Sequence, residues 1–148
     1  MKILGIDSSA RSASAAITDG EKVLGCFYTN TGLTHSQTLM PMIDGMLKNA
    51  GVRVSDIDLF AVAAGPGSFT GVRIGVAAAK GFAWGGELPC YGVSTLEAMA
   101  LSLGAYQGYV CPVMDARRSQ VYNALFYVNQ GQPNRITEDR AISLEQLK

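Results

Sequence analysis

A hairpin signal at Asp19-Gly20 most constrains how this chain can begin to fold. The pair separates two short strand-like runs, residues 14–18 and 22–29, and Asp-Gly between such runs favours a tight β-turn. A buried strand is predicted at residues 3–7, before both runs. The sequence therefore predicts that the chain begins with three strands in a meander.

Helices and further strands follow the meander. Thr34 and Gln37 have the spacing of a capping box, apolar residues recur at helical spacing up to residue 50, and Gly51 provides the stop. Pro41 lies inside this helix and is expected to kink its first turns. Two more strands (58–64 and 90–93) and two more helices (70–84 and 94–103) are predicted after it.

The order of these elements, β-β-β-α-β-α-β followed by a connecting helix, predicts an α/β fold. It is the order of the ribonuclease-H-like half of the actin-like (ASKHA) architecture, which is usually duplicated. A fainter repeat supports duplication, because residues 109–115, 121–128 and 135–142 repeat the strands of the meander, with a turn at 131–134.

The repeat also predicts the domain organisation. We expect a ribonuclease-H-like domain at residues 1–104 and the start of a second, similar domain at 105–148, which is apparently truncated. The preferred interpretation is a fragment of a longer protein. The alternative is a naturally short chain with a frayed C-terminal helix.

Composition excludes some classes of function. Twelve basic and twelve acidic residues cancel, whereas a domain that binds nucleic acid alone usually carries a basic surplus, so any RNA contact needs a local patch or a partner. No apolar run approaches the length of a membrane span or a signal peptide, and a cytoplasmic protein without membrane contact is expected. Three widely spaced cysteines without a C-x-x-C pair fit reduced thiols rather than disulfides or a zinc site.

The most specific stretch runs from Gly65 to Gly75, between a predicted strand and a predicted helix. Backbone N–H groups and the helix dipole favour anions at such a turn. A P-loop is excluded because no lysine follows Thr70, and a dinucleotide fingerprint fits poorly because Thr70 occupies the place of its third glycine. Gly71, Gly75 and Ala79, four residues apart, predict a ridge of small residues that lets another element approach closely.

Several segments, in order along the chain, carry a family resemblance. They are Ile6-Asp7-Ser8-Ser9, His35-Ser36-Gln37 with Leu39-Met40-Pro41, Gly65-Pro66-Gly67-Ser68-Phe69-Thr70-Gly71-Val72-Arg73 with Gly75, Gly92-Val93-Ser94-Thr95-Leu96, and Asp115-Ala116-Arg117. In this combination the chain resembles the TsaB (YeaZ) family, from residue 4 to residue 117.

The resemblance implies a scaffolding and activating subunit of the tRNA threonylcarbamoyladenosine synthesis complex. Such a subunit binds and activates a TsaD-type transferase, which moves a threonylcarbamoyl group from its adenylate to an adenosine beside the tRNA anticodon. A TsaE-type ATPase joins the larger assembly, tRNA is contacted only indirectly, and a homodimer is expected when the chain is alone. The resemblance implies no catalytic residue, no metal and no cofactor in this chain.

Two helices carry the partner surface that the resemblance implies, because TsaB-type chains pair with TsaD through a four-helix bundle. The predicted interface residues are Leu39, Met40, Met42, Ile43, Met46, Leu47, Val72, Arg73, Val76 and Lys80. The apolar residues of the first helix cover more than one stripe of its surface. The alternative, that they are all core residues, stays open because methionine fills cores as readily as interfaces.

A degenerate nucleotide site is the second candidate. Asp7 ends the first strand, where actin-like ATPases hold a metal–nucleotide phosphate. The candidate residues are Asp7, Ser8, Ser9, Gly65, Gly67 and Ser68. The alternative function is accordingly an actin-like small-molecule kinase or ATPase that uses Asp7 and the Gly65–Gly75 turn.

A hydrolase is a weaker alternative. His35 is the only histidine, and no other plausible base accompanies Ser36 or Ser68. One histidine also cannot supply the paired histidines that TsaD carries for its metal.

Overall fold

The computed structural model describes residues 1–147, which form two compact units. The first unit comprises residues 1–64 and 68–92, and the second comprises residues 65–67 and those from 93 onward. The helix expected at 94–103 therefore lies in the second unit, while the domain boundary at residue 104 stays a prediction. No helix within residues 1–147 is long and apolar enough to cross a lipid bilayer.

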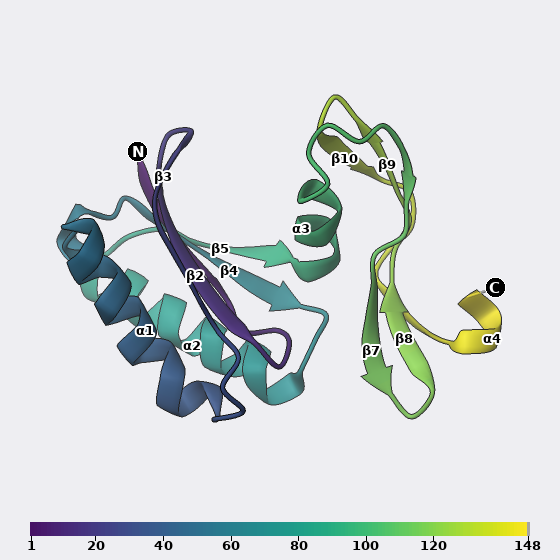
Figure 1. The fold of residues 1–148 in the computed structure, drawn as a ribbon, viewed down its shortest axis with the longest axis horizontal. Helices are drawn as coiled ribbons and strands as arrows, with labels where there is room; N and C mark the ends of the chain where they lie inside the picture. The colour runs from purple at the N-terminus through teal and green to yellow at the C-terminus, as the bar shows by residue number, and fades with distance from the viewer. Residues whose placement is uncertain (148) are drawn as a thin grey trace. The chain divides into compact units, whose positions relative to one another are not determined.

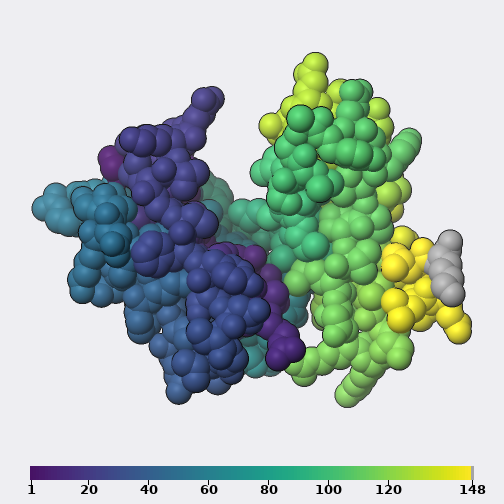
Figure 2. All heavy atoms as spheres, in the orientation of Figure 1, coloured from purple at the N-terminus to yellow at the C-terminus, as the bar shows by residue number. Residues whose placement is uncertain are grey.

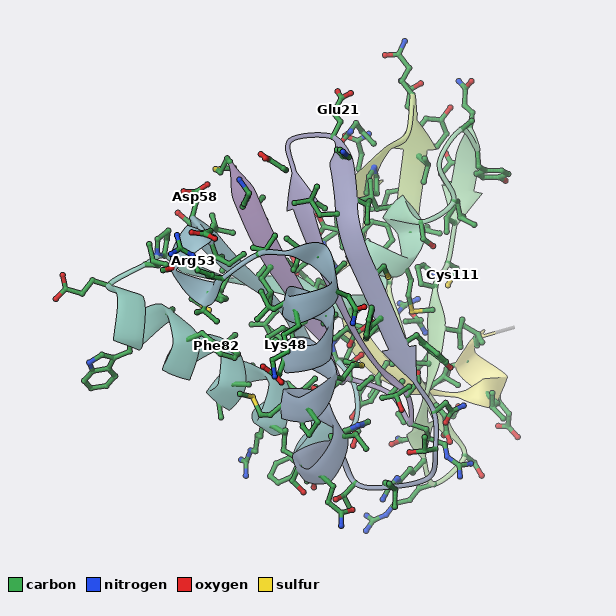
Figure 3. The ribbon with its side chains drawn as sticks, turned by 60° about the vertical axis from the view of Figure 1, so that its left-hand side comes forward. Glu21, Lys48, Arg53, Asp58, Phe82 and Cys111 are labelled. Carbon is green, nitrogen blue, oxygen red and sulfur yellow. The ribbon has the colours of Figure 1, made fainter. Side chains whose placement is uncertain are left out.

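A five-stranded sheet forms the centre of the first unit, in the order β3-β2-β1-β4-β5 (Figure 1). β1 (Lys2–Asp7), β2 (Ala13–Asp19) and β3 (Lys22–Thr29) form the predicted antiparallel meander. The turn between β2 and β3, at Glu21, projects from the unit (Figures 2 and 3). β4 (Leu59–Gly65) pairs in parallel with β1, and β5 (Cys90–Ser94) is the next strand in the sheet.

Two helices, α1 (His35–Ala50) and α2 (Phe69–Gly86), lie side by side on one face of this sheet (Figures 1 and 3). The predicted capping box of Thr34 and Gln37 begins α1, and Gly51 ends it in the left-handed conformation that glycine adopts easily. α1 continues through Pro41 as one helix. A short 3₁₀ turn, η1 (Val54–Asp56), leads from α1 towards β4.

Apolar side chains from the sheet and both helices meet in one core. Its fully buried members include Leu4, Ile17, Leu39, Ile43, Met46 and Phe60. The ridge of small residues predicted on α2 faces this core, because Gly71, Gly75, Ala79 and Ala83 are its buried positions. The small ridge lets α2 lie close to β1, and larger side chains there would hold the helix away from the sheet.

The second unit contains the predicted second meander, but each of its three strands is broken in two. The elements are α3 (Thr95–Leu101), β6 (Gly108–Val110), β7 (Val113–Arg117), β8 (Gln120–Asn123), β9 (Phe126–Asn129), β10 (Gln132–Arg135), β11 (Arg140–Ser143) and α4 (Leu144–Leu147). They form two three-stranded sheets, β10-β9-β6 and β11-β8-β7. The prediction of continuous strands at 109–115, 121–128 and 135–142 is therefore wrong in its boundaries.

A proline explains one of these breaks, and hydrogen bonds between distant residues explain the other two. Pro112 has no N–H for a ladder and stands between β6 and β7. Between β8 and β9, Leu125 leaves both ladders: its N–H donates to the Thr137 hydroxyl at 2.8 Å, and its carbonyl accepts from the N–H of Ile136, also at 2.8 Å. The segment from 136 to 139 thus bonds to the break in the middle strand instead of continuing β10.

A half-buried arginine joins α3 to β10 within the second unit. The Arg135 guanidinium donates to Ser94 Oγ at 2.9 Å and to the Glu97 carboxylate at 3.2 Å, and it also pairs with Asp139. It lies 4.7 Å from the centre of the Phe126 ring, which is fully buried. Burial lowers the pKa of Arg135, but hydrogen bonds to Asp139 and Glu97 outweigh this effect and raise the pKa above its usual value.

Candidate functional site

The loop after β1 lies against the beginning of α2 and brings together four of the predicted nucleotide-site residues. A Cβ atom on Gly71 would overlap the carbonyl oxygen of Ser8, so the loop and the first turn of α2 touch without any side chain between them. Ser8 Oγ donates to the Gly71 carbonyl at 2.8 Å, and the Ser68 hydroxyl caps the helix by accepting the Gly71 N–H at 3.3 Å.

A hydrogen bond to this loop occupies a backbone donor that an anion would need. The Ser68 N–H donates to the Ser9 carbonyl at 2.6 Å, and the Asp7 carboxylate accepts the Ser9 N–H at 2.8 Å. The Ser68 N–H at the helix start is therefore already bound by the protein, and the Asp7 carboxylate accepts one hydrogen bond through a single oxygen. Ser9 Oγ is buried and has no hydrogen-bond partner among residues 1–147.

Gly65 and Gly67 frame the turn before α2 along the chain. Gly65 ends β4 with a φ of +112°, a region that glycine adopts readily and other residues rarely do. A cis peptide bond joins it to Pro66, and Gly67 precedes the N-cap Ser68.

His35, the first residue of α1, holds that helix to the same loop. Its Nε2 lies 2.8 Å from the Ala10 carbonyl, and because a carbonyl only accepts, Nε2 carries the proton. No group of three or more His, Cys, Asp or Glu residues that could hold a metal ion occurs within residues 1–147. The hydrogen bond to Ala10 makes this histidine a structural contact between helix and loop.

The exposed side of α2 carries two large aromatic side chains. Phe69 is 70% exposed and Trp84 is 86% exposed. They lie on one strip of the helix with three further exposed residues, and we call this strip the α2 outer face: Phe69, Arg73, Ala77, Lys80 and Trp84. The Arg73 guanidinium stacks over the Phe69 ring, 3.6 Å from its centre.

The prediction from the sequence found only Arg73 and Lys80 on this face and missed Phe69, Ala77 and Trp84. The signal was present, because Gly71, Gly75, Ala79 and Ala83 form the buried ridge. A position two residues beyond a ridge residue lies about 200° around the helix, on the opposite side. The spacing that predicts the ridge therefore also predicts an outward strip around Arg73, and Phe69, Ala77 and Trp84 lie within about 40° of Arg73 around the helix.

The structure corrects the prediction for α1. Leu39, Ile43, Met46 and Leu47 are core residues, none more than 6% exposed, so they have almost no surface to offer a partner. Met40 is 47% exposed, and Met42, Val72 and Val76 are half-buried. The exposed apolar surface of this helical pair thus belongs mainly to α2.

A hollow of about 460 Å³ lies at the C-terminal end of α2, and its lining includes residues on either side of Trp84 in the sequence. Val54, Gly81, Phe82, Gly85 and Leu88 line it, and Cβ atoms on Gly81 and Gly85 would meet nothing within 4 Å. Phe82 is stacked on the buried Phe60, with ring centres 5.6 Å apart. On η1, a hydrogen bond from Arg53 holds the pKa of Asp56 below its usual value.

Comparisons with known proteins agree with this fold. The family described as TsaD: tRNA N6-adenosine threonylcarbamoyltransferase matches residues 23–148. The chain is 35% identical over 97% of its length to the tRNA threonylcarbamoyladenosine biosynthesis protein TsaB of Bacillus subtilis, and it spans 63% of that protein. It is 40% identical over 82% of its length to TsaB of Escherichia coli and spans 53% of it.

The solved structure of YeaZ from Pseudomonas aeruginosa superimposes with a TM-score of 0.87 at 30% identity, covering 95% of this chain and 67% of that one. The chain belongs to the TsaB (YeaZ) family. It spans less than two thirds of the length of the curated TsaB relatives described above.

More distant structures show the fold of this TsaB-family chain. A ROK hexokinase from Thermus thermophilus superimposes with a TM-score of 0.52 at 14% identity, and an activator of 2-hydroxyisocaproyl-CoA dehydratase from Clostridium difficile with a TM-score of 0.57 at 14%. These neighbours confirm the predicted actin-like α/β fold. At such identities they carry no information about function.

Proposed function

We propose that this chain is a non-catalytic scaffolding and activating subunit in the synthesis of threonylcarbamoyladenosine on tRNA. It binds a TsaD-type transferase through the α2 outer face, with Met40, Met42, Val72 and Val76 at the border of the contact. The observation that carries the proposal is the exposure of two large aromatic side chains, Phe69 and Trp84, on one strip of an 18-residue helix. The naming of its relatives as tRNA threonylcarbamoyladenosine biosynthesis proteins supports the pathway.

The side chains of this face are those that anchor protein interfaces. Tryptophan and arginine are enriched at the energetic centres of interfaces, and a buried aromatic side chain contributes about 150–250 Å² of contact. At about 25 cal/mol per Å², burying Phe69 and Trp84 together gives a gross gain of several kcal/mol, from which the entropic cost of association is subtracted. Ala77, between them on the helix, lets a partner helix approach closely.

Activation follows if the transferase binds this face more tightly in its active conformation than in its inactive one. A TsaE-type ATPase joins the same assembly, and tRNA is held chiefly by the partner. In the absence of the transferase, two copies of the chain cover each other's α2 outer face as a homodimer.

The loop beside α2 supports a role without catalysis. Asp7 is hydrogen-bonded to the Ser9 N–H, and the Ser68 N–H is bound by the Ser9 carbonyl. An actin-like kinase that binds a phosphate at the helix start would require the Ser68 N–H to be released from the Ser9 carbonyl. The loop would then have to open at the point where it touches Gly71.

Light scattering of the chain mixed with the TsaD-type subunit of its organism tests the proposal. The wild-type chain should form a heterodimer and stimulate threonylcarbamoyl transfer to tRNA. Ala77→Glu places a charge at the centre of the α2 outer face without touching the core, so it should weaken the complex by on the order of 2 kcal/mol, or roughly 30-fold. Stimulation should fall in parallel.

Val23→Glu is the matched control, because Val23 is an apolar residue of β3 that is 58% exposed and lies outside the α2 outer face. This variant should bind and stimulate as the wild type does. A heterodimer that Ala77→Glu leaves intact would contradict the proposed surface, and a wild-type chain that forms no heterodimer would contradict the scaffolding role.

A further inference from the structure

The hairpin between β7 and β8 has an unusual backbone for its sequence. Arg117, Arg118 and Ser119 have φ values of 64°, 51° and 59°, so three consecutive residues with side chains adopt the left-handed conformation. Tight hairpins that need such φ values normally use glycine, asparagine or aspartate. Arginine at two of these positions is therefore unfavourable for the fold, and backbone strain of this kind directs attention to what the side chains do.

The surrounding contacts hold this shape while leaving the side chains outside. The Arg117 N–H donates to Asp115 Oδ1 at 2.7 Å, and the Ser119 carbonyl accepts the N–H of Leu144 at 3.3 Å. The four residues from 117 to 120 are all exposed. The tip is thus fixed by its own backbone and presents two neighbouring arginines to solvent.

Within residues 1–147, no ion pair neutralises the two guanidinium groups. The carboxylates that form ion pairs within residues 1–147 are Asp19, Asp44, Asp56, Glu97 and Asp139, and none of them pairs with Arg117 or Arg118. The one acid of the hairpin, Asp115, accepts a hydrogen bond from the backbone N–H of Arg117. Although the chain has no net charge, this tip is a local basic patch.

Two adjacent guanidinium groups with a hydroxyl beside them suit a phosphate. A guanidinium donates two parallel N–H bonds to phosphate oxygens and keeps its charge at every physiological pH. A hairpin tip has no groove or pocket for a base edge, and contacts to the phosphodiester backbone are independent of sequence. These features favour the backbone of a nucleic acid over a small phosphorylated ligand, which needs an enclosing site.

We propose that the hairpin tip Arg117-Arg118-Ser119 contacts the phosphodiester backbone of the RNA on which the complex acts. The proposal rests on the proposed function for the identity of that RNA. It adds one direct contact to the indirect contact expected from the sequence, at a surface distinct from the α2 outer face. The contact positions RNA and does not read its bases.

Salt-dependent binding of a fluorescent tRNA transcript to the complex with the TsaD-type subunit tests this contact. The double variant Arg117→Gln, Arg118→Gln should bind on the order of tenfold more weakly at about 0.1 M salt, and the slope of log K against log salt should become shallower by about 2. A variant with both arginines changed to lysine keeps the charges and should keep most of the slope.

Glycine variants separate a binding role from a purely structural one. Arg118→Gly removes backbone strain and the guanidinium together, so it should raise the urea midpoint of the chain while weakening RNA binding. Gln130→Gly is the matched control, because Gln130 has a φ of 51° in the turn after β9 and lies outside the hairpin tip, so this variant should raise the midpoint with affinity changed by less than about twofold. Tighter folding of Arg118→Gly with unchanged RNA binding would overturn the proposal.

Complex formation is measured first by light scattering, so that the two proposals fail separately. A variant complex that forms normally and binds RNA with the wild-type affinity and slope overturns the hairpin contact and leaves the scaffolding role intact. If the wild-type chain forms no complex, the scaffolding role fails, and the same change in slope must then appear in the weaker binding of RNA by the free chain. Unchanged RNA binding with loss of binding to anionic lipid vesicles would assign the tip to a membrane surface instead.

Discussion

Gly71 and Ser8 show how a missing methyl group positions the beginning of α2. A Cβ atom on Gly71 would overlap the Ser8 carbonyl oxygen, and the Gly71 carbonyl accepts the Ser8 hydroxyl at 2.8 Å. Because the neighbouring atom is backbone, it cannot move aside as a flexible side chain would. The close contact therefore depends on glycine at this position.

Gly71→Ala should lower the free energy of unfolding by about 1–3 kcal/mol or more, because the loop or the helix must shift to admit the methyl group. Gly81→Ala is the control on the same helix, where a Cβ meets open space. Alanine there should be neutral or stabilise by up to about 1 kcal/mol. Urea unfolding of both variants checks the prediction, and equal midpoints would contradict the close contact.

At the scale of elements, the first unit could be predicted well from the sequence because its signals are local. The Asp19-Gly20 turn, the capping box of Thr34 and the stop at Gly51 each act within a few residues, and the structure has its elements there. The buried ridge of α2 follows from its spacing in the same way. Pro41 was expected to kink α1, which nonetheless continues as one helix whose apolar face packs on the sheet.

The second unit could not be predicted as well, because two of its three strand breaks depend on contacts between distant residues. The Leu125 N–H donates a hydrogen bond to the Thr137 hydroxyl, twelve positions along the chain, and the residue pattern of neither segment predicts this bond. The same limit applies to the candidate sites. Apolar residues cover more than one stripe of α1, so the sequence could not show that Leu39 and Ile43 are core residues rather than interface residues. On α2 the signal was present, because the ridge of small residues marks the side opposite the exposed face.

The Arg135 cluster gives a prediction for the element pair α3 and β10. Arg135→Met removes the hydrogen bonds to Ser94, Glu97 and Asp139 and leaves the two carboxylates close together without a cation. The variant should lose about 1–3 kcal/mol of stability, measured by urea unfolding and by faster hydrogen exchange in β10. Arg135→Lys keeps the charge but not the planar guanidinium, so its stability should lie between those of the wild type and Arg135→Met. Wild-type stability in both variants would contradict a stabilising role for the cluster.

At the scale of the whole molecule, the two proposed interaction surfaces lie on different units. The first unit carries the α2 outer face, and the second carries the arginine hairpin. The chain spans 63% of the Bacillus subtilis relative and 53% of the Escherichia coli one. The proposed binding of the transferase uses a surface of the first unit alone, and that surface contains the chain's only tryptophan.

Trp84 allows the most direct test of the central claim. Labelling the chain with 5-fluorotryptophan gives a single fluorine NMR signal, because Trp84 is the only tryptophan, and its 86% exposure makes that signal sensitive to solvent. On addition of the TsaD-type subunit, the signal should shift and lose its dependence on the H₂O to D₂O ratio, and Ala77→Glu should prevent both changes. An unchanged, solvent-sensitive signal at concentrations where light scattering shows the heterodimer would contradict binding through the α2 outer face.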